Sequence, residues 1–140
     1  MKKYTILLIA IILIASVSLS AQSFKVIVNN TNSVSSLAKT EVSNYLLKKR
    51  TKWSNGTDVI AVDLGTKSSA RATFSKDILG KTVAQVRAYW QQSVFSGKDT
   101  PPREMESDNA VLEFVKANHG AIGYVSANAN TDGVKVISVK

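Results

Sequence analysis

Short apolar runs rich in β-branched residues alternate along the chain with segments whose apolar residues recur at helical spacing. The runs that predict buried strands are Phe24–Val28, Val59–Val62, Ala121–Val125 and Val134–Val139. The segments that predict helices are Lys39–Lys48, Ser68–Ile78, Val83–Val94 and a stretch between Ser107 and Gly120. Alternating strands and helices are typical of βα units, so we expect an α/β fold with a mainly parallel sheet of about four to five strands, flanked by helices.

Local signals place the ends of several of these helices. Thr82 and Gln85 form a Thr-x-x-Gln capping box ahead of a helix whose stripe Val83, Val86, Trp90 and Val94 is expected to face inward. Gly120 is expected to be the left-handed stop of the helix that Ser107 caps. Between these two helices, the segment 97–106 contains two consecutive prolines and is expected to be a surface loop, neither helix nor central strand.

The first 21 residues differ in pattern from the rest. Lys2 and Lys3 precede an uncharged run of 16 residues, Tyr4–Leu19, and small residues follow. These are the three parts of a secretory signal peptide, and the run is short for a spanning helix, which needs about 20 residues. We expect residues 1–21 to be a signal peptide, residues 22–140 to form one domain, and the protein to be periplasmic. An uncleaved N-terminal anchor is the alternative.

Charge and composition narrow the chemistry. The chain has a net charge of +8, and loss of Lys2 and Lys3 would leave +6, which favours anionic partners. Cysteine is absent, which excludes thiol catalysis, zinc–thiolate sites and a lipoprotein anchor, and a single histidine argues against histidine-based metal or triad chemistry. No nucleophile or nucleotide-binding motif occurs. We therefore predict no enzymatic activity, no cofactor and no metal site.

Two loops follow predicted strands and could hold a ligand, because ligands of such sheets bind outside the carboxyl ends of the strands. The first contains Ser68, Ser69, Ala70 and Arg71 at a helix start, where free amides, hydroxyls and a guanidinium suit an anion. An ordinary serine-capped helix with a solvated arginine is the alternative. The second loop, Asn29–Ser36, offers Asn29 and Asn32, whose amides could bind a ligand or satisfy their own backbone.

Other polar clusters have simpler interpretations. Basic residues at positions 48–52 beside Trp53 could bind nucleic acid or lipid, since a stacking aromatic beside positive charge suits single strands. Export argues against nucleic acid, and a solvated helix end explains the same residues. Asp58 and Asp63 flank a predicted strand and are expected at the surface or in turns.

Several segments, taken in order, resemble the phosphate-binding proteins of ABC transporters. They are Val28–Leu37, Tyr45–Lys48 with Trp53–Gly56, Ser68–Phe74, and Gly120–Val125. The third is similar to the family pattern S-G-T-R-x-x-F, and the last matches G-A-I-G-Y-V at every position. The resemblance covers nearly all of the chain after residue 21.

The resemblance implies a single lobe of a type 2 periplasmic binding protein. In the full-length family, phosphate lies between two lobes and an S-G-T loop supplies hydroxyl and backbone donors. By this match Ser68, Ser69 and Ala70 occupy that loop and Arg71 follows it. Two departures stand out: Ser69 replaces the glycine that allows close approach of the backbone, and Ala70 replaces the threonine hydroxyl.

The function implied is an exported solute-binding module that binds phosphate or a similar oxyanion. With one lobe missing, the anion would stay exposed to solvent and salt, so we expect weak binding unless two copies form a homodimer that rebuilds a cleft. The alternative is a non-transport protein that keeps the lobe as a scaffold and binds an envelope or transporter partner.

Overall fold

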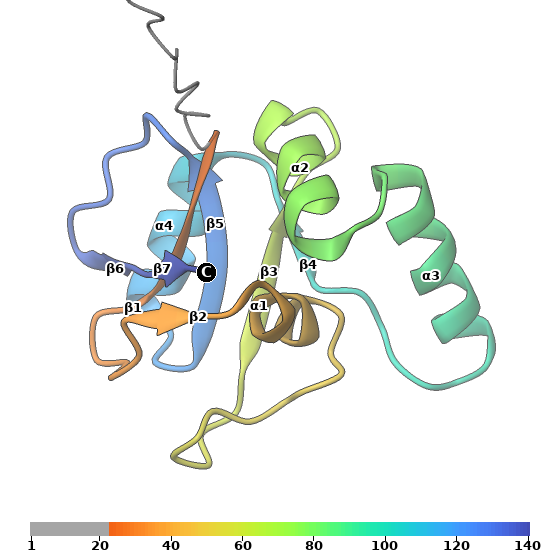
Figure 1. The fold of residues 1–140 in the computed structure, drawn as a ribbon, viewed down its shortest axis with the longest axis horizontal. Coiled ribbons are helices and arrows are strands. Elements are labelled where there is room, and N and C mark those ends of the chain that lie inside the picture. Colours follow the sequence, from red (N-terminus) through yellow and green to blue (C-terminus); the bar gives the residue numbers. More distant parts are fainter. Residues whose placement is uncertain (1–22) are drawn as a thin grey trace, which may run out of the picture.

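A five-stranded sheet forms the centre of the molecule in the computed structural model, which describes residues 23–140 (Figure 1). Its strands are β1 (Phe24–Asn29), β3 (Ile60–Leu64), β4 (Arg103–Met105), β5 (Ala121–Ser126) and β6 (Val134–Val136), in the spatial order β4-β3-β5-β1-β6. β3 pairs in parallel with β4 and β5, whereas β1 runs antiparallel to β5 and β6. All strands except β1 therefore point one way, which confirms the predicted mainly parallel sheet.

The C-terminal end of the chain is tied back to its N-terminal part. The predicted strand 134–139 is divided into β6 and β7 (Ser138–Val139), and β7 pairs in parallel with β2 (Ser36–Leu37). Lys140 donates its backbone N–H to Leu37 O, and its carbonyl accepts the N–H of Lys39. The first helix thus begins against the last residue of the sequence.

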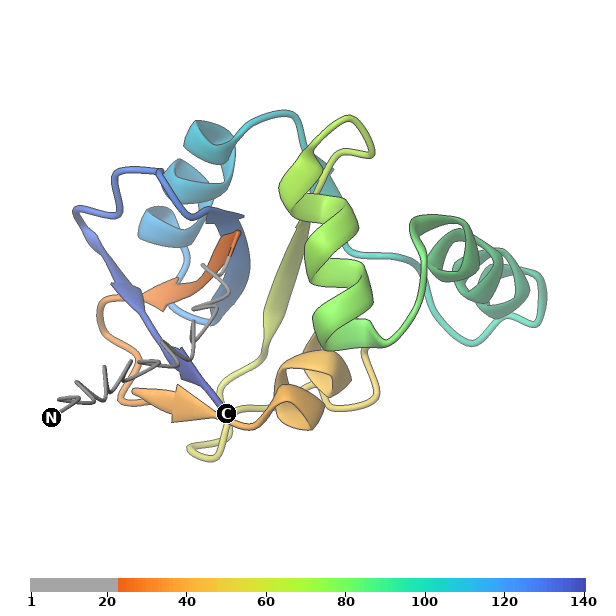
Figure 2. The same ribbon diagram turned by 45° about the horizontal axis from the view of Figure 1, so that its top comes forward.

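Helices cover both faces of the sheet. They are α1 (Lys39–Leu46), α2 (Ser69–Phe74), the π-helix η1 (Ser75–Leu79), α3 (Val83–Phe95) and α4 (Asp108–Ala117). α1, α2 and η1 lie on one face and α4 on the other, while α3 projects to the side of the sheet (Figure 2). None of the helices within residues 23–140 is both long and apolar enough to cross a membrane. The predicted signal peptide, residues 1–21, lies outside the described residues.

An aromatic cluster anchors α2 to the sheet. The rings of Phe74 and Tyr124 stack with centroids 3.8 Å apart, and Phe24 meets Phe74 edge-on at 5.4 Å. All three side chains are fully buried. Aromatic pairs of this kind add to the stabilisation from buried area. The cluster fixes the C-terminal end of α2 against β1 and β5.

The helix ends show which local signals are reliable. Thr82 accepts a hydrogen bond from the backbone of Gln85, and the Gln85 side chain accepts one from Thr82 N–H, which confirms the capping box. The prediction for Gly120 was wrong, because α4 ends at Ala117 and Gly120 does not have a positive φ. Gly120 instead lies so close to the carbonyl of Asp58 that a Cβ would overlap with it.

The segment predicted as a surface loop after α3 contains a short strand. β4 begins directly after Pro101 and Pro102 and pairs with β3 at the edge of the sheet. The two prolines exclude a helix and a central strand, but an edge strand that starts beyond them loses no hydrogen bond. Val94 also differs from expectation: its side chain is 52% exposed, although Val86 and Trp90 on the same helix are buried.

Candidate functional site

The turn before α2 lies at the carboxyl end of β3 and leaves polar groups free. Ser68 is the N-cap, yet its hydroxyl does not bond to the helix, in contrast to the Thr82 and Ser107 hydroxyls, which each accept from an amide of their own helix. Within residues 23–140, the amides of Ser69 and Ala70 donate to no backbone carbonyl. Free amides at a helix start attract negative charge.

The residues of this turn differ in their exposure to solvent. Ser69 is exposed and Ser68 is half-buried, so their hydroxyls and the Ser69 amide can meet a ligand from solvent. Ala70 is only 1% exposed because its methyl group belongs to the hydrophobic core. Of the predicted loop residues, Ser68 and Ser69 are therefore the ones positioned for direct contact with an anion.

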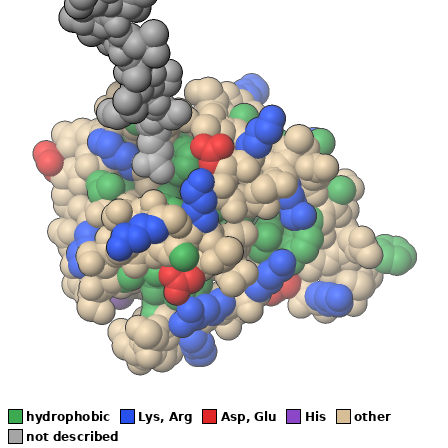
Figure 3. All heavy atoms as spheres, in the orientation of Figure 1, with side chains coloured by type: hydrophobic (Ala, Val, Ile, Leu, Met, Phe, Trp, Pro, Cys, Tyr) green, Lys and Arg blue, Asp and Glu red, His purple; other side chains and the backbone are tan. Residues whose placement is uncertain are grey.

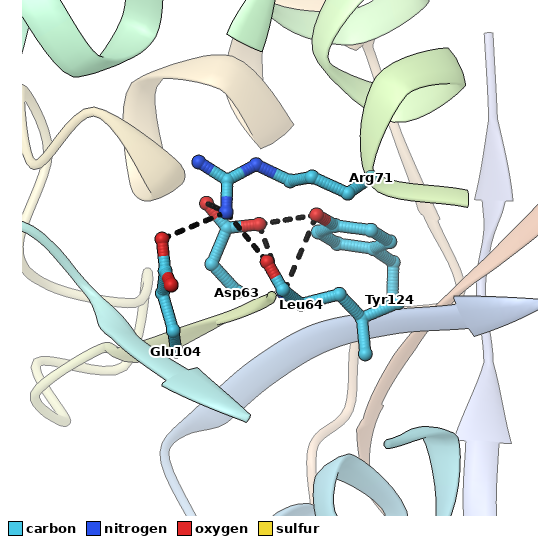
Figure 4. A network of polar contacts seen from close by, with 5 residues as sticks. All are labelled: Asp63, Leu64, Arg71, Glu104 and Tyr124. Atoms are coloured by element: carbon cyan, nitrogen blue, oxygen red, sulfur yellow. Dashed lines mark hydrogen bonds and ion pairs between the residues drawn. The ribbon is translucent and has the colours of Figure 1, made fainter. Parts of the chain in front are cut away.

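Arg71, the fourth residue of the predicted loop, is held inside the protein. Its Nη1 donates to Leu64 O and to Glu104 Oε1 at 3.1 Å, and lies 3.4 Å from Asp63 Oδ2 (Figure 4). The Arg71 side chain is 5% exposed. Two carboxylates thus balance the Arg71 guanidinium. The alternative prediction of a solvent-exposed arginine is therefore wrong.

Asp63 and Tyr124 complete this network. The Tyr124 hydroxyl and the Leu64 backbone N–H both donate to Asp63 Oδ1. Burial raises the pKa of Asp63, while the Arg71 guanidinium and then the Tyr124 hydroxyl oppose that rise. Burial also raises the pKa of Tyr124, and the neighbouring Asp63 raises it further, so the phenol stays protonated. The expectation that Asp63 lies at the surface or in a turn was wrong, since it is buried within β3.

A groove adjoins this network on the side of α3, and we call it the α3 groove. Its volume is about 460 Å³. Its lining residues are Asp63, Arg71, Arg87, Trp90, Gln91, Val94, Phe95, Pro101, Pro102 and Glu104. It is thus bounded by one face of α3, by the segment leading into β4 and by the charged groups at the end of β3. The only indication of this groove in the sequence is an indirect one: the acidic residue Asp63 directly follows the apolar run Val59–Val62.

The second predicted loop, Asn29–Ser36, lies at the opposite end of the strands from the turn before α2. Because β1 is antiparallel to β5, Asn29 at its carboxyl end is beside the start of β5, away from Ser68. The Asn29 amide donates to the carbonyls of Val115 and Lys116, and its Oδ1 accepts from Thr31. Asn32 uses its Oδ1 to accept from the Val34 N–H. The structure therefore does not bring Asn29 and Asn32 together with Ser68–Arg71.

The basic segment near Trp53 is built around a buried indole. Trp53 is 7% exposed, and its Nε1–H donates to Gly120 O at 3.0 Å. Its ring packs against Tyr45, with centroids 4.5 Å apart. This leaves no open ring face for a base to stack on. Lys and Arg side chains are spread across the face shown in Figure 3 and do not gather in one patch.

Comparison with solved structures identifies the fold. A phosphate ABC transporter substrate-binding protein with bound phosphate from Clostridium perfringens superimposes with a TM-score of 0.66 at 19% identity, covering 84% of this chain and 44% of that one. PstS from Borrelia burgdorferi gives 0.64 at 13% identity, covering 84% and 47%. An ABC-type phosphate transport receptor from Vibrio cholerae gives 0.60 at 16% identity, covering 84% and 46%. The sequence matches no protein-family model and no curated protein.

The fold is that of a single lobe of a periplasmic binding protein. The solved structures named above are phosphate-binding components of ABC transporters, and this chain spans less than half of their length. The resemblance found in the sequence is thereby matched in three dimensions at the level of the fold.

Proposed function

We propose that this protein is an exported oxyanion-binding module that holds phosphate or a similar anion weakly at the turn before α2. The observation that carries the proposal is that, among residues 23–140, the Ser68 hydroxyl does not cap the helix and the Ser69 amide has no backbone acceptor. The turn lies at the carboxyl end of β3, the edge at which ligands bind in sheets of this kind. The phosphate-binding proteins that share the fold support this choice of anion.

Weak binding follows from what surrounds the turn. Ser69 is exposed, so a bound anion would keep part of its hydration and be screened by salt. The Nη1 group of Arg71 is already engaged by Asp63 and Glu104, so this part of the guanidinium adds little attraction at the turn. A second copy of the chain facing this turn would exclude water, which makes a phosphate-dependent homodimer the arrangement in which binding becomes tight.

Calorimetric titration with inorganic phosphate tests the proposal. Replacing both Ser68 and Ser69 by alanine should abolish the measured heat, because it removes both reachable hydroxyls. Ser54→Ala, at an exposed position in another turn, is the matched control and should leave the titration unchanged. Equal phosphate affinity in the double variant and the wild type would refute the proposed site. Sedimentation with and without phosphate shows whether two copies associate.

Export is part of the proposal and has its own test. If residues 1–21 are a signal peptide, the protein recovered from the periplasm begins near Ala21 or Gln22, and its intact mass shows the loss of the preceding residues. Recovery of the uncleaved chain with the membrane fraction would favour the anchor instead.

A second candidate is an envelope interaction protein that keeps the lobe as a scaffold. The observation that favours it is the exposed apolar end of α3, where Phe95 is 95% exposed and Val94 is 52% exposed. Crosslinking in intact cells should then capture an envelope or transporter partner through α3. Capture that is unchanged in a Phe95→Ser variant would count against a role for this helix.

A further inference from the structure

The α3 groove has the size and lining of a small-molecule site. Its volume of about 460 Å³ lies within the range of about 300 to 1,000 Å³ that is usual for ligand sites. The indole of Trp90, the side chain of Val94 and the ring of Pro101 make its walls largely apolar. Such sites generally combine apolar walls with a few polar groups that fix the orientation of the ligand.

The Arg71 guanidinium, which lines this groove, uses only part of its hydrogen-bonding capacity. All the hydrogen bonds and ion pairs that the Arg71 side chain makes within residues 23–140 use Nη1. Nε is buried and has no hydrogen-bond partner there. Figure 4 shows Nε and Nη2 along the edge of the guanidinium that faces away from Asp63 and Glu104. That edge presents two parallel N–H donors, the arrangement that a carboxylate accepts in bidentate fashion.

A buried donor without a partner costs free energy, and a ligand that supplied the missing acceptor would recover it. Arg71 is 4% exposed and is one of the residues that line the groove. The unpaired edge is therefore an observation independent of the shape of the groove. It indicates a ligand with two oxygen atoms at one end.

We propose that the α3 groove binds a small organic carboxylate, with the carboxylate on the Nε–Nη2 edge of Arg71 and an apolar body against Trp90 and Val94. A planar monoanion fits better than phosphate because Asp63 and Glu104 already place two carboxylates on the other side of the guanidinium. A dianion would add repulsion from both. Arg87, which also lines the groove, adds positive charge to its wall.

The site differs from the turn proposed above for oxyanions. It lies between α3 and the end of β3, and it involves neither Ser68 nor Ser69. The Ser68→Ala/Ser69→Ala variant should therefore lose phosphate binding and keep carboxylate binding. The two proposals can consequently fail separately.

The test uses 3-phenylpropionate and its uncharged analogue 3-phenylpropan-1-ol with protein produced from the full-length chain. Binding is followed by the fluorescence of Trp90, which lines the groove, and by the NMR signal of the buried Arg71 Nε–H. We expect saturable binding of the acid, about tenfold tighter than the alcohol, as befits a charged bidentate contact. A shift of the Arg71 Nε–H signal with the acid alone is also expected. Equal affinity for acid and alcohol, or no binding of either, would overturn the proposal.

Variants of exposed residues keep the test free of folding artefacts. Val94→Glu places a carboxylate on the groove wall and should weaken binding of the acid about tenfold or more through repulsion and lost apolar contact. Val136→Glu, at a similarly exposed position on β6, is the matched control and should have no effect. An unchanged affinity in Val94→Glu would contradict the assignment of the groove. Displacement of the acid by equimolar inorganic phosphate would contradict the choice of a carboxylate.

Discussion

Replacing Arg71 by methionine should destabilise the fold strongly, because it would leave the Asp63 carboxylate buried without a cation. The Asp63 side chain is only 6% exposed, so water cannot replace the lost charge. Removing one partner of a buried ion pair typically costs about 3–5 kcal/mol. Asp63 would keep the Tyr124 hydroxyl and the Leu64 amide as donors, which places the expected loss near the lower end, at about 3 kcal/mol.

Two further variants separate the buried charge from the lost side chain. The double variant Arg71→Met/Asp63→Asn removes both charges and should recover about 1–2 kcal/mol of the loss, since a neutral amide is less costly to bury than an unpaired carboxylate. Arg87→Met removes an exposed arginine from the same groove and should change stability by no more than about 0.5 kcal/mol.

The pH dependence gives a second readout. Arg71 lowers the pKa of Asp63 against the effect of burial, so the Arg71→Met variant should have an Asp63 pKa raised further above its unfolded value. A raised pKa means that the folded state binds the proton more tightly, so stability is gained as the pH falls through the folded pKa towards the unfolded one. The deficit of Arg71→Met relative to the wild type should therefore shrink at about pH 5 compared with about pH 7.5.

Urea unfolding followed by tryptophan fluorescence at both pH values is the assay. A loss below about 1 kcal/mol at neutral pH would show that Asp63 does not depend on Arg71 for its charge. A deficit that is the same at both pH values would refute the account based on a buried carboxylate.

Two other predictions follow from close contacts in the core. Tyr124→Phe should cost about 1–3 kcal/mol in urea unfolding, since it removes the hydroxyl that donates to the buried Asp63, and a cost near zero would show that this bond adds nothing. Gly120→Ala should cost about 2–4 kcal/mol because its Cβ would overlap with Asp58 O, whereas Gly97→Ala, with open space around it but a φ of 71°, should cost about 1 kcal/mol. Equal losses for the two glycine variants would contradict the overlap.

Local signals in the sequence predicted most of the helices and their starts. The capping box of Thr82 and Gln85 involves residues three apart, so the sequence alone carries the information. The reason for the glycine at position 120 is not local, because the carbonyl that excludes a side chain there belongs to Asp58, far away in sequence. A glycine selected by a distant contact and one selected by a left-handed turn look the same in a sequence.

The direction of β1 was the largest gap in the prediction. An apolar run indicates a strand but not which way it runs, and a run that follows the rule for parallel strands would have placed Asn29 beside Ser68. Its antiparallel pairing with β5 depends on partners about a hundred residues away, such as Phe24 with Ser126. The turn at Ser68 could therefore be identified from the sequence as a candidate anion site. Whether Asn29 and Asn32 lie beside that turn depends on the direction of β1, which the sequence does not give.

Asp63 shows a signal that could have been weighted differently. It follows Val59–Val62 without a turn residue in between, and an ionisable residue inside an apolar run is buried only if partners are available. Those partners come from two other elements, Arg71 from α2 and Tyr124 from β5, and Glu104 from β4 shares the Arg71 guanidinium with Asp63. The sequence contains all of them but gives no indication that they meet.

The position of β1 inside the sheet governs when this protein can begin to fold. The first strand of the domain needs β5 on one side and β6 on the other, and the hydrogen bonds of Lys140 with Leu37 and Lys39 require the last residue of the sequence. A chain emerging from the ribosome would thus expose β1 without its neighbours until β5 and β6 have been synthesised. Because pairing between segments that are far apart in sequence must wait for the later segment, such delayed closure slows folding.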